Sequence, residues 1–153
     1  MSLRDSINDG LKQSMKARDA ARTSTLRLIS AAIRDRDIAA RGEGASAEGI
    51  ADGEILALLG KMVRQRQESA KIYEEGGRLE LAAKELSEIT IIEDFLPRQL
   101  TAAETEAAIA AVIAATGASG IRDMGKVMAA LKETYTGSMD FSTVGAAVKA
   151  RLM

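Results

Sequence analysis

The chain has 153 residues and a formal net charge of −1, and it contains no cysteine and no histidine. This composition excludes a disulfide framework and a thiolate nucleophile, and it removes the commonest general base and metal ligand. Aromatic residues make up only 3% of the chain, so the core has to be built from aliphatic side chains. We therefore expect an all-α protein, with room for one domain or two small ones.

The charge is unevenly distributed. Residues 1–41 carry nine Lys/Arg against five Asp/Glu, residues 42–96 carry six against twelve, and residues 97–153 carry six against five. A modestly basic N-terminal region is more often a solvated surface than an RNA site. No stretch reaches the roughly 18 apolar residues of a membrane span. We expect a cytoplasmic protein with no membrane partner, and the sequence shows no ligand set for a metal or a cofactor.

Helical periodicity predicts two amphipathic helices in the first forty residues. The first is expected from Ser2 to about Ala17, because apolar residues recur every four positions. Asp19 is expected to cap the second, which runs to about Ala40. The inward side chains are predicted to be Leu3, Ile7, Leu11 and Met15, then Leu26, Ile29, Ala32 and Ile33. The glycine-rich segment 41–49 predicts a mobile loop with no phosphate-loop signature.

Residues 52–96 predict a pair of long antiparallel helices. Asp52 is expected to cap the first helix, and Gly76 and Gly77 to end it. The second helix is expected from Leu79 to Phe95. The side chains predicted to be buried are Ile55, Leu58, Leu59, Met62 and Val63 in the first helix, and Leu79, Ala82, Leu86 and Ile89 in the second. Short connections favour antiparallel neighbours, so residues 1–96 are predicted to form a helical bundle.

The only proline, Pro97, marks a junction between two predicted domains. Proline has no N–H and disfavours helix at the residue before it, so the preceding helix should stop near Leu96. Thr101 and Glu104 have the spacing of a capping box that opens a new helix. We expect an N-terminal helical bundle over 1–96 and a small three-helix domain over 97–153.

Three short helices are predicted in the C-terminal domain. The first is alanine-dense, from Thr101 to Thr116, and the second runs around Asp123 to Leu131. Asp140 is expected to cap the last one. The inward side chains are predicted to be Ile109, Val112 and Ile113, then Val127, Met128 and Leu131, then Phe141, Val144, Val148 and Leu152. A core this small contributes little stability alone.

Two basic motifs permit both a functional and a structural interpretation. Arg64 and Arg66 could contact phosphate, or Arg66 could form a salt bridge with a glutamate of the next helix. Gly125 and Lys126 could place a helix N-terminus beside an anion. In the structural interpretation Gly125 permits close helix packing and Lys126 is simply exposed.

Three acidic residues, Glu85, Glu88 and Asp94, could hold a metal or act as paired carboxylates. A solvated surface or an arginine partner is the stronger interpretation, because no histidine or second carboxylate helix supports a metal site. No catalytic constellation appears elsewhere in the sequence, so residue chemistry alone predicts no reaction.

The sequence resembles the YqeY family over nearly its whole length. The resemblance is carried by Lys61–Ser69, Gly77-Arg78, Leu81-Ala82, Glu85, Glu88-Ile89, Leu96–Leu100, Gly117–Ser119, Asp123–Met128 and Gly137–Asp140. The second predicted helix fits as well, through Arg27-Leu28 and Ala31–Ile33. The Leu-Pro-x-Gln-Leu junction and the Met124-Gly125-Lys126 motif are the specific parts of the match.

The resemblance implies a function near tRNA. The family is similar to the tail of the B subunit of the tRNA-dependent amidotransferase, and a similar module is appended to some glutaminyl-tRNA synthetases. It implies a helical bundle, a joint near Pro97 and possible tRNA contact, without a self-contained amide-transfer site. Family association would otherwise suggest a carbon–nitrogen ligase with glutamine as amide donor. One departure is that the turn before the last helix keeps only Lys132 as a base, which removes phosphate contacts.

We therefore expect a non-catalytic accessory protein that contacts tRNA, a tRNA-dependent amidotransferase or an aminoacyl-tRNA synthetase. The alternatives are a protein-interaction module without an RNA role and an amidotransferase-like enzyme. Two basic surfaces compete as the RNA site. One comprises Lys16, Arg18, Arg22 and Arg34, and the other comprises Gly125, Lys126, Lys132 and Lys149. The family motif favours the second surface.

Overall fold

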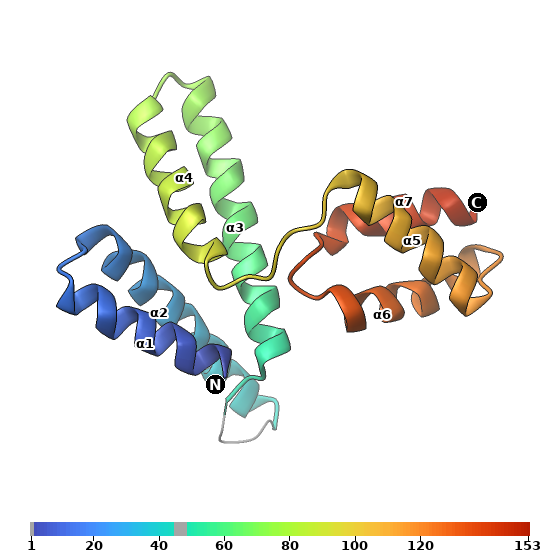
Figure 1. Ribbon diagram of the computed structural model, residues 1–153, viewed down its shortest axis with the longest axis horizontal. Helices are drawn as coiled ribbons and strands as arrows, with labels where there is room; N and C mark the ends of the chain where they lie inside the picture. Colours follow the sequence, from blue (N-terminus) through green and yellow to red (C-terminus); the bar gives the residue numbers. More distant parts are fainter. Residues whose placement is uncertain (1, 45–48) are drawn as a thin grey trace. The chain divides into compact units, whose positions relative to one another are not determined.

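The computed structural model describes residues 2–44 and 49–153, and over these ranges the protein is all-α, which confirms the predicted fold class. Figure 1 shows the helices in chain order. Their bounds are Leu3–Lys16 (α1), Ala20–Gly42 (α2), Asp52–Glu75 (α3), Leu79–Glu93 (α4), Ala102–Thr116 (α5), Met124–Tyr135 (α6) and Phe141–Leu152 (α7), with a 3-10 turn Ile121–Asp123 (η1) before α6. Of the predicted loop, residues 41 and 42 belong to α2, and residues 45–48 lie outside the described residues.

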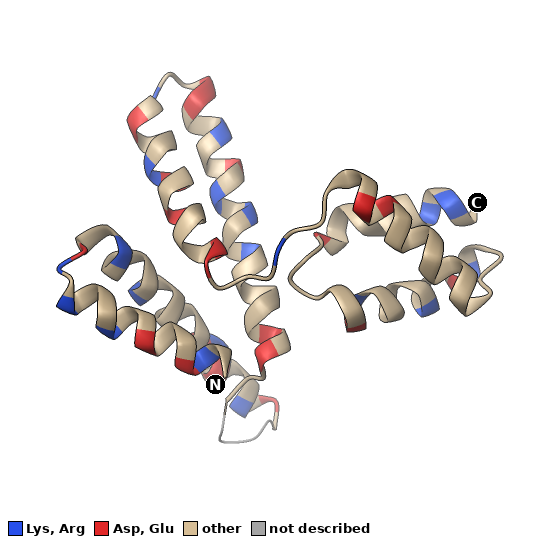
Figure 2. Ribbon diagram, viewed as in Figure 1, with Lys and Arg blue, Asp and Glu red and all other residues tan. Residues whose placement is uncertain are grey.

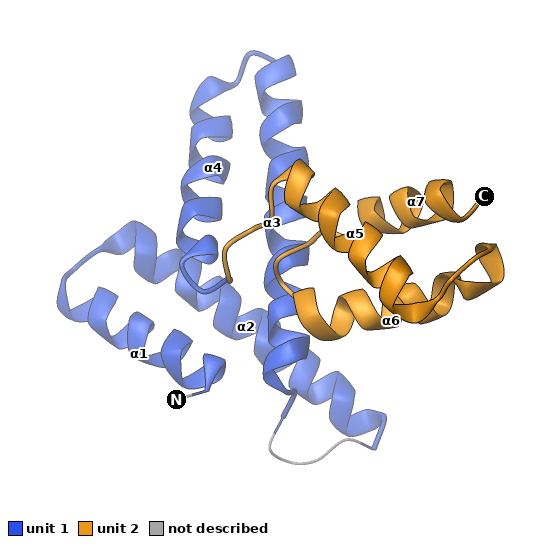
Figure 3. Cartoon of the chain, turned by 45° about the vertical axis from the view of Figure 1, so that its right-hand side comes forward, with its two compact units in different colours: residues 1–96 blue, residues 97–153 orange. Residues whose placement is uncertain are grey.

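The chain divides into two compact units, residues 1–96 and residues 97–153 (Figure 3). Helices α1–α4 form the first, here called the N-terminal unit, and α5–α7 form the C-terminal unit. At the boundary, Leu96 N donates a hydrogen bond to Glu93 O at 3.1 Å, and Pro97 then has no N–H to continue the helix. Independent folding of each unit stays a prediction, which is tested below.

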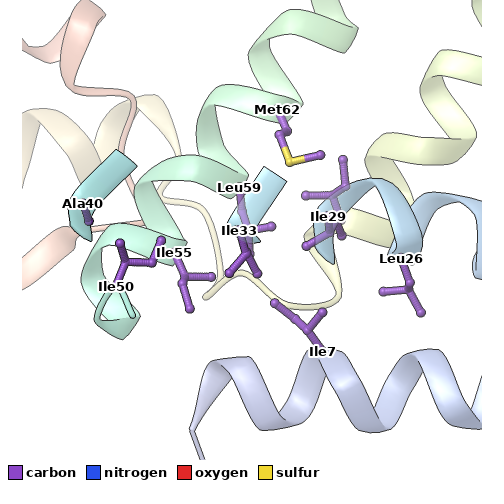
Figure 4. Packing of buried hydrophobic residues seen from close by; sticks show 10 residues of the cluster. Ile7, Leu26, Ile29, Ile33, Ala40, Ile50, Ile55, Leu59 and Met62 are labelled. Atoms are coloured by element: carbon purple, nitrogen blue, oxygen red, sulfur yellow. The ribbon is translucent and has the colours of Figure 1, made fainter. Parts of the chain in front are cut away.

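Aliphatic side chains from four helices build the core of the N-terminal unit. Ile7, Leu26, Ile29, Leu59 and Ile92 are all almost completely buried. Figure 4 shows Ile7 and Leu59 projecting into the same space from opposite sides. Complete burial of such a side chain contributes about 1.5–3 kcal/mol, and the partly buried ring of Phe95 packs against this aliphatic cluster.

Of the two caps predicted in the N-terminal unit one is correct and one is wrong, and in the C-terminal unit Asp140 caps α7 as predicted. The Asp19 carboxylate accepts a hydrogen bond from Arg22 N at 3.1 Å, as expected for an N-cap. Asp52 does not cap α3, because it is the first helical residue and the N-cap is Ala51. Both oxygens of Asp52 instead lie 3.3 Å from Leu3 N, so this carboxylate serves the first turn of α1.

A partly buried ion pair joins α1 and α2 to the segment before α3. Arg4 Nη1 lies 2.8 Å from Asp37 Oδ2, and Arg4 Nη2 donates to Ile50 O at 3.1 Å. Ile50 N donates to Asp37 Oδ1 at 2.9 Å. The hydrogen bond from Arg4, together with that from Ile50, holds the pKa of Asp37 below its usual range. Three segments of chain are thereby fixed at one carboxylate.

The outer part of the α3–α4 hairpin, residues 70–86, is called the arm here. Figure 1 shows it extending past the ends of α1 and α2. Ala70 and Ala82 are buried in it, but Leu79 is 67% exposed and Leu86 is 47% exposed. The prediction that these leucines are buried is wrong. It took the spacing of apolar residues as the mark of a core, but no helix among the described residues of this unit covers that side of α4.

The C-terminal unit has its own aliphatic core, in which Ile109, Val127, Leu131 and Val148 are completely buried. Helix α6 begins at Met124 and continues to Tyr135, one residue later and four residues further than predicted. Among the described residues, no single helix is long and apolar enough to cross a membrane. Only α5 taken together with η1 and α6, across a bend of 98°, meets that requirement of length and composition.

The predicted capping box opens the C-terminal unit. Thr101 Oγ1 accepts a hydrogen bond from Glu104 N at 3.1 Å, and Glu104 Oε1 accepts from Thr101 N at 3.0 Å. Arg98 adds a two-pronged contact to the same carboxylate, at 2.8 and 2.9 Å. These donors lower the pKa of Glu104 to about 2, with the Arg98 hydrogen bond as the largest cause. The residues after Pro97 are thus tied to the start of α5.

Candidate nucleic-acid interface

The start of α6 presents two of the predicted contact residues to solvent. Gly125 and Lys126 are the second and third residues of α6, and both are exposed. A β-carbon built on Gly125 would have no atom within 4 Å. The interpretation in which Gly125 permits close helix packing is therefore wrong. What the glycine does provide is an uncovered backbone at a helix N-terminus, which a phosphate oxygen can approach.

Helix α7 brings further cations to the same end of the C-terminal unit. A β-carbon on Gly145 would lie 3.8 Å from Met124 Cε, and α7 also contacts η1. Lys149 lies one turn beyond Gly145 on the same side of α7, because residues four apart are helical neighbours. Arg151 follows in the last turn. Figure 2 shows Lys/Arg at the end of α7 and at the start of α6, on one end of this unit.

Four cations thus gather at what we call the basic end: Arg122 in η1, Lys126 in α6, and Lys149 and Arg151 in α7. All four are exposed, and none forms an ion pair with a described residue. Sequence reasoning missed Arg122 and Arg151. Neither belongs to a motif. Arg122 lies only four residues before Lys126, whereas Arg151 comes to this end of the unit through the packing of α7 against η1 and α6.

One carboxylate, Asp123, lies within the basic end. Its oxygen accepts a hydrogen bond from Ser119 N at 3.0 Å. That bond is the largest cause holding the pKa of Asp123 below its usual range, and the charges of Lys126 and Arg122 add to it. Asp123 therefore stays ionised, offsets one of the four positive charges, and locks the turn that positions Lys126.

Lys132, the fourth C-terminal candidate, lies apart from the basic end. It is exposed in the last turn of α6, six residues after Lys126. Six residues correspond to about 9 Å along a helix and a rotation of about 120° to another face. Lys132 therefore lies on another face of α6 than Lys126, and away from the end of the unit where α6 begins and α7 ends.

Arg66 has a structural role that the sequence left open. Its Nε lies 2.8 Å from Glu88 Oε2 on α4, and its Nη1 donates to Met62 O at 3.1 Å. The two charged side chains are only 14% and 17% exposed, so the pair joins α3 to α4 in a partly desolvated position. Arg64 lies two residues before Arg66 on α3, so its side chain is on another face of the helix, and it is half-buried.

The rival basic surface on α1 and α2 is divided by the structure. Arg22 is bound to Asp94, with Nη1 2.7 Å from the carboxylate, and its guanidinium lies 5.8 Å from the centre of the Phe95 ring. Arg18 instead lines a surface hollow of 620 Å³ together with Arg27, which sequence reasoning missed. Arg34 lies about three turns beyond Arg22, and both Arg34 and Lys16 are exposed.

A family model described as Yqey-like protein matches residues 4–152. This chain belongs to the YqeY-like family. The match spans both units, so the family assignment covers the basic end of the C-terminal unit and the hollow of the N-terminal unit alike, and the predicted resemblance is confirmed.

This YqeY-like chain is also similar to named proteins of two yeasts. The chain is 30% identical over 100 residues to "Altered inheritance of mitochondria protein 41, mitochondrial" of Lachancea thermotolerans, and 27% identical over 100 residues to the protein of that name in Saccharomyces cerevisiae strain YJM789. Each match covers 65% of this chain and 51% of the relative. The chain thus spans about half the length of these relatives.

The acidic residues of α4 that were weighed as a metal site are partners of arginines. Glu88 binds Arg66, and Asp94 binds Arg22. Glu85 is half-buried on the same helix. Among the described residues of this YqeY-like chain, no group of three or more Asp or Glu is placed to hold a metal ion. The interpretation of Glu88 and Asp94 as arginine partners is confirmed.

Proposed function

We propose that this YqeY-like protein is a non-catalytic accessory protein that contacts tRNA, alone or on an enzyme of tRNA aminoacylation or amidation. One observation supports the proposal most directly. Four exposed cations without ion-pair partners among the described residues lie at the end of the C-terminal unit where the backbone of Gly125 is uncovered. Such a group can bind consecutive phosphates of a nucleic acid, because each contact releases a counterion.

The size of the group limits the affinity. Each phosphate contact contributes about 0.7–0.9 to the slope of log K against log salt concentration. With four cations and one opposing carboxylate, Asp123, about three effective contacts remain, which corresponds to a loss of about 20–40-fold in affinity between 50 and 200 mM salt. Binding is expected to be micromolar or weaker at physiological salt, as suits an accessory protein.

Filter retention of tRNA at two salt concentrations tests the proposal. Lys126→Ala/Lys149→Ala is expected to lower the affinity at least tenfold and to reduce the salt slope by about 2. The matched control Lys16→Ala/Arg18→Ala removes the same charge from the N-terminal unit and is expected to bind like the parent. If the parent does not retain tRNA at low salt, or only the control loses binding, the proposal is wrong.

A second candidate function is a helical protein-interaction module without an RNA role. The specific observation in its favour is the arm, where Ile72 and Leu79 are each 67% exposed and Leu86 is 47% exposed. Apolar side chains of this size clustered on one exposed segment mark interaction sites in soluble proteins. This function stands if tRNA binding fails while a protein partner is found for the arm.

Amide transfer by the chain itself is not part of the proposal. The sequence has no cysteine and no histidine, so the usual glutaminase nucleophile and its base are both missing. We expect no turnover when the chain is incubated with glutamine, ATP and misacylated tRNA. Product above the buffer control that disappears on changing one side chain would contradict this expectation.

A further inference from the structure

The hollow of the N-terminal unit has no part in the proposed tRNA contact. Most of its lining is one face of α2, because the residues from that helix recur at positions i, i+3, i+4, i+7 and i+8. They are Ala20, Thr23, Ser24, Arg27 and Leu28. Met15, near the end of α1, and Arg18, in the turn that follows, complete the lining. The hollow is thus a helix face about two turns long, bordered by the α1–α2 turn.

Exposed apolar side chains and unpaired positive charge lie side by side in the hollow. Met15 and Leu28 are 45% and 46% exposed. Arg18 and Arg27 are exposed as well, and neither forms an ion pair with a described residue. Arg27 Nη2 lies 3.7 Å from Met15 Sδ, so the two kinds of surface meet directly. A ligand that is both apolar and anionic would satisfy both.

The charges around the hollow favour an anionic partner. Residues 11–30 carry five basic side chains and one acidic side chain, Asp19. Figure 2 shows Lys/Arg at the end of α1 and the start of α2. The Asp19 carboxylate is engaged as the N-cap of α2. Asp94 is bound by Arg22, which lies about 140–160° around α2 from Ala20 and Arg27, so that ion pair is on the opposite side of the helix.

The turn beside the hollow holds an arginine where glycine is usual. Asp19 N donates to Ser14 O at 3.0 Å and Arg18 N donates to Met15 O at 3.2 Å, which is the Schellman ending of a helix. Arg18 has φ of 58°, and it is the one non-glycine residue with positive φ among the described residues. Glycine would close this turn with less strain, so the turn does not account for the arginine, whose side chain lines the hollow.

We propose that the hollow binds an acidic amphipathic helix of a partner protein. The apolar face of that helix covers Met15 and Leu28, and its carboxylates pair with Arg18 and Arg27. This is the helix-in-groove mode of recognition, for which flexible methionine side chains are well suited. The distance between two packed helices depends on the side chains at the contact. Small exposed residues in the hollow, Ala20 and Ser24, therefore allow a close approach.

A nucleic acid fits the hollow less well than an acidic helix. Phosphates would pair with the arginines but leave Met15 and Leu28 uncovered, and no aromatic ring lines the hollow for a base to stack on. A helix face two turns long makes an interface below about 1,200 Å², so weak, micromolar binding is expected. The proposal uses no residue of the basic end, so it and the proposed tRNA contact stand or fall separately.

Fluorescence anisotropy with the ribonuclease-treated full chain tests the proposal. The probe is a labelled, helix-forming peptide of about 18 residues, with leucines at i, i+4, i+7 and i+11 and glutamates beside them. It is expected to bind at least tenfold more tightly than a scrambled peptide of the same composition. Equal binding of the two peptides would show that only charge is recognised, and it would overturn the proposal. So would no binding of the amphipathic peptide up to about 500 µM.

Charge-reversal variants locate the acidic side of the peptide. Arg18→Glu/Arg27→Glu is expected to weaken binding more than tenfold. Lys61→Glu/Lys71→Glu, a matched control at exposed sites on α3, is expected to bind like the parent. Arg18→Gly should raise the urea midpoint, because glycine relieves the positive φ, while peptide affinity falls severalfold. Binding of both Arg18 variants as tight as that of the parent would overturn the proposal.

Serine variants locate the apolar side of the peptide. Met15→Ser/Leu28→Ser is expected to weaken binding more than tenfold, and circular dichroism should show an unchanged fold, since both side chains are exposed. Ile72→Ser/Leu79→Ser removes two 67% exposed side chains of the arm and is the matched control. Loss of binding in the arm variant alone would place the peptide on the arm and overturn the proposal. An oligouridylate that binds more tightly than the peptide, and only with both arginines present, would overturn it in favour of a nucleic acid.

Discussion

The N-terminal unit and the basic end of the C-terminal unit differ in the roles of their cations. In the N-terminal unit arginines join helices, through the pairs Arg4–Asp37, Arg22–Asp94 and Arg66–Glu88. In the C-terminal unit the four cations of the basic end point to solvent without ion-pair partners among the described residues. The N-terminal unit has more cations, so the number of cations and their freedom from ion pairs favour different units as the surface for phosphate. The predictions below test this comparison.

The largest expected effect tests whether the two units are separate bodies. Leu59→Ala in the N-terminal unit and Leu131→Ala in the C-terminal unit each remove a completely buried side chain, at a cost of about 2–5 kcal/mol. A unit as small as residues 97–153 has a total stability of about 3–8 kcal/mol. Leu131→Ala should therefore largely unfold it while the N-terminal unit persists, and amide NMR spectra of the full chain measure this.

A control variant and a fragment of the chain complete the test of this first prediction. Leu81→Ala, at a 37% exposed position, is the control and should change neither unit. Residues 1–96 expressed alone should give a helical circular dichroism spectrum. Loss of native signals from both units in Leu131→Ala, or a random-coil spectrum from residues 1–96, would show that the two units fold as one.

The next effect concerns the pairing of charges in the N-terminal unit. Glu88→Gln leaves the Arg66 guanidinium partly buried without its carboxylate, which should cost about 1–3 kcal/mol in urea unfolding. Glu80→Gln, on the exposed face of the same helix, is the control and should cost less than about 0.5 kcal/mol. Equal effects at both positions would mean that the Arg66–Glu88 pair contributes no more than surface charge.

Acid should weaken the N-terminal unit through Asp37. Its pKa is lower in the folded protein than the 3.8 of an unperturbed carboxyl, because Arg4 and Ile50 donate hydrogen bonds to it. A lowered folded pKa gives stability that is fully present above the unfolded value and is lost as the pH falls through the folded one. Asp37→Asn should therefore destabilise the unit at pH 6 and have less effect below about pH 3.8. Asp35→Asn, an exposed neighbour on α2, should show no such pH dependence.

Much of the fold could be predicted because its signals are local. The capping box at Thr101, the caps at Asp19 and Asp140, and the stop at Pro97 depend on neighbours within four residues. The burial of Leu79 could not be judged in this way, since it depends on whether another helix covers α4. The prediction that Asp52 caps α3 was wrong for a similar reason, because the group that its carboxylate binds, Leu3 N, lies far away in the sequence.

The candidate site was harder to predict than the fold. Lys126 was found because it belongs to a recognisable motif. Arg122, four residues before it, belongs to none, and Arg151 comes to this end of the unit only when α7 packs against η1 and α6. In the sequence Lys132 appeared to be as good a candidate as Lys126, but in the structure it lies on another face of α6. The Arg66–Glu88 pair was one of two open alternatives, and only the contact between α3 and α4 decides between them.

The smallest expected effect separates a structural from a binding role at Gly125. A β-carbon at Gly125 meets no atom within 4 Å, and the same holds at Gly60 in α3. Replacing an exposed helical glycine by alanine stabilises a protein by about 0.4–1 kcal/mol, and a position near the helix end, such as that of Gly125, should lie at the low end. Gly125→Ala and Gly60→Ala should thus both raise the stability of their units slightly.

Binding of tRNA should distinguish the two variants. If a phosphate approaches the backbone at Gly125, the added methyl group of Gly125→Ala obstructs it and the affinity should fall about three- to tenfold, while Gly60→Ala binds like the parent. Urea unfolding and filter retention on the same preparations measure both effects. A gain in stability with unchanged tRNA binding in Gly125→Ala would confine the contact to the side chains of the basic end, because a glycine kept for helix packing alone is already excluded by its open surroundings.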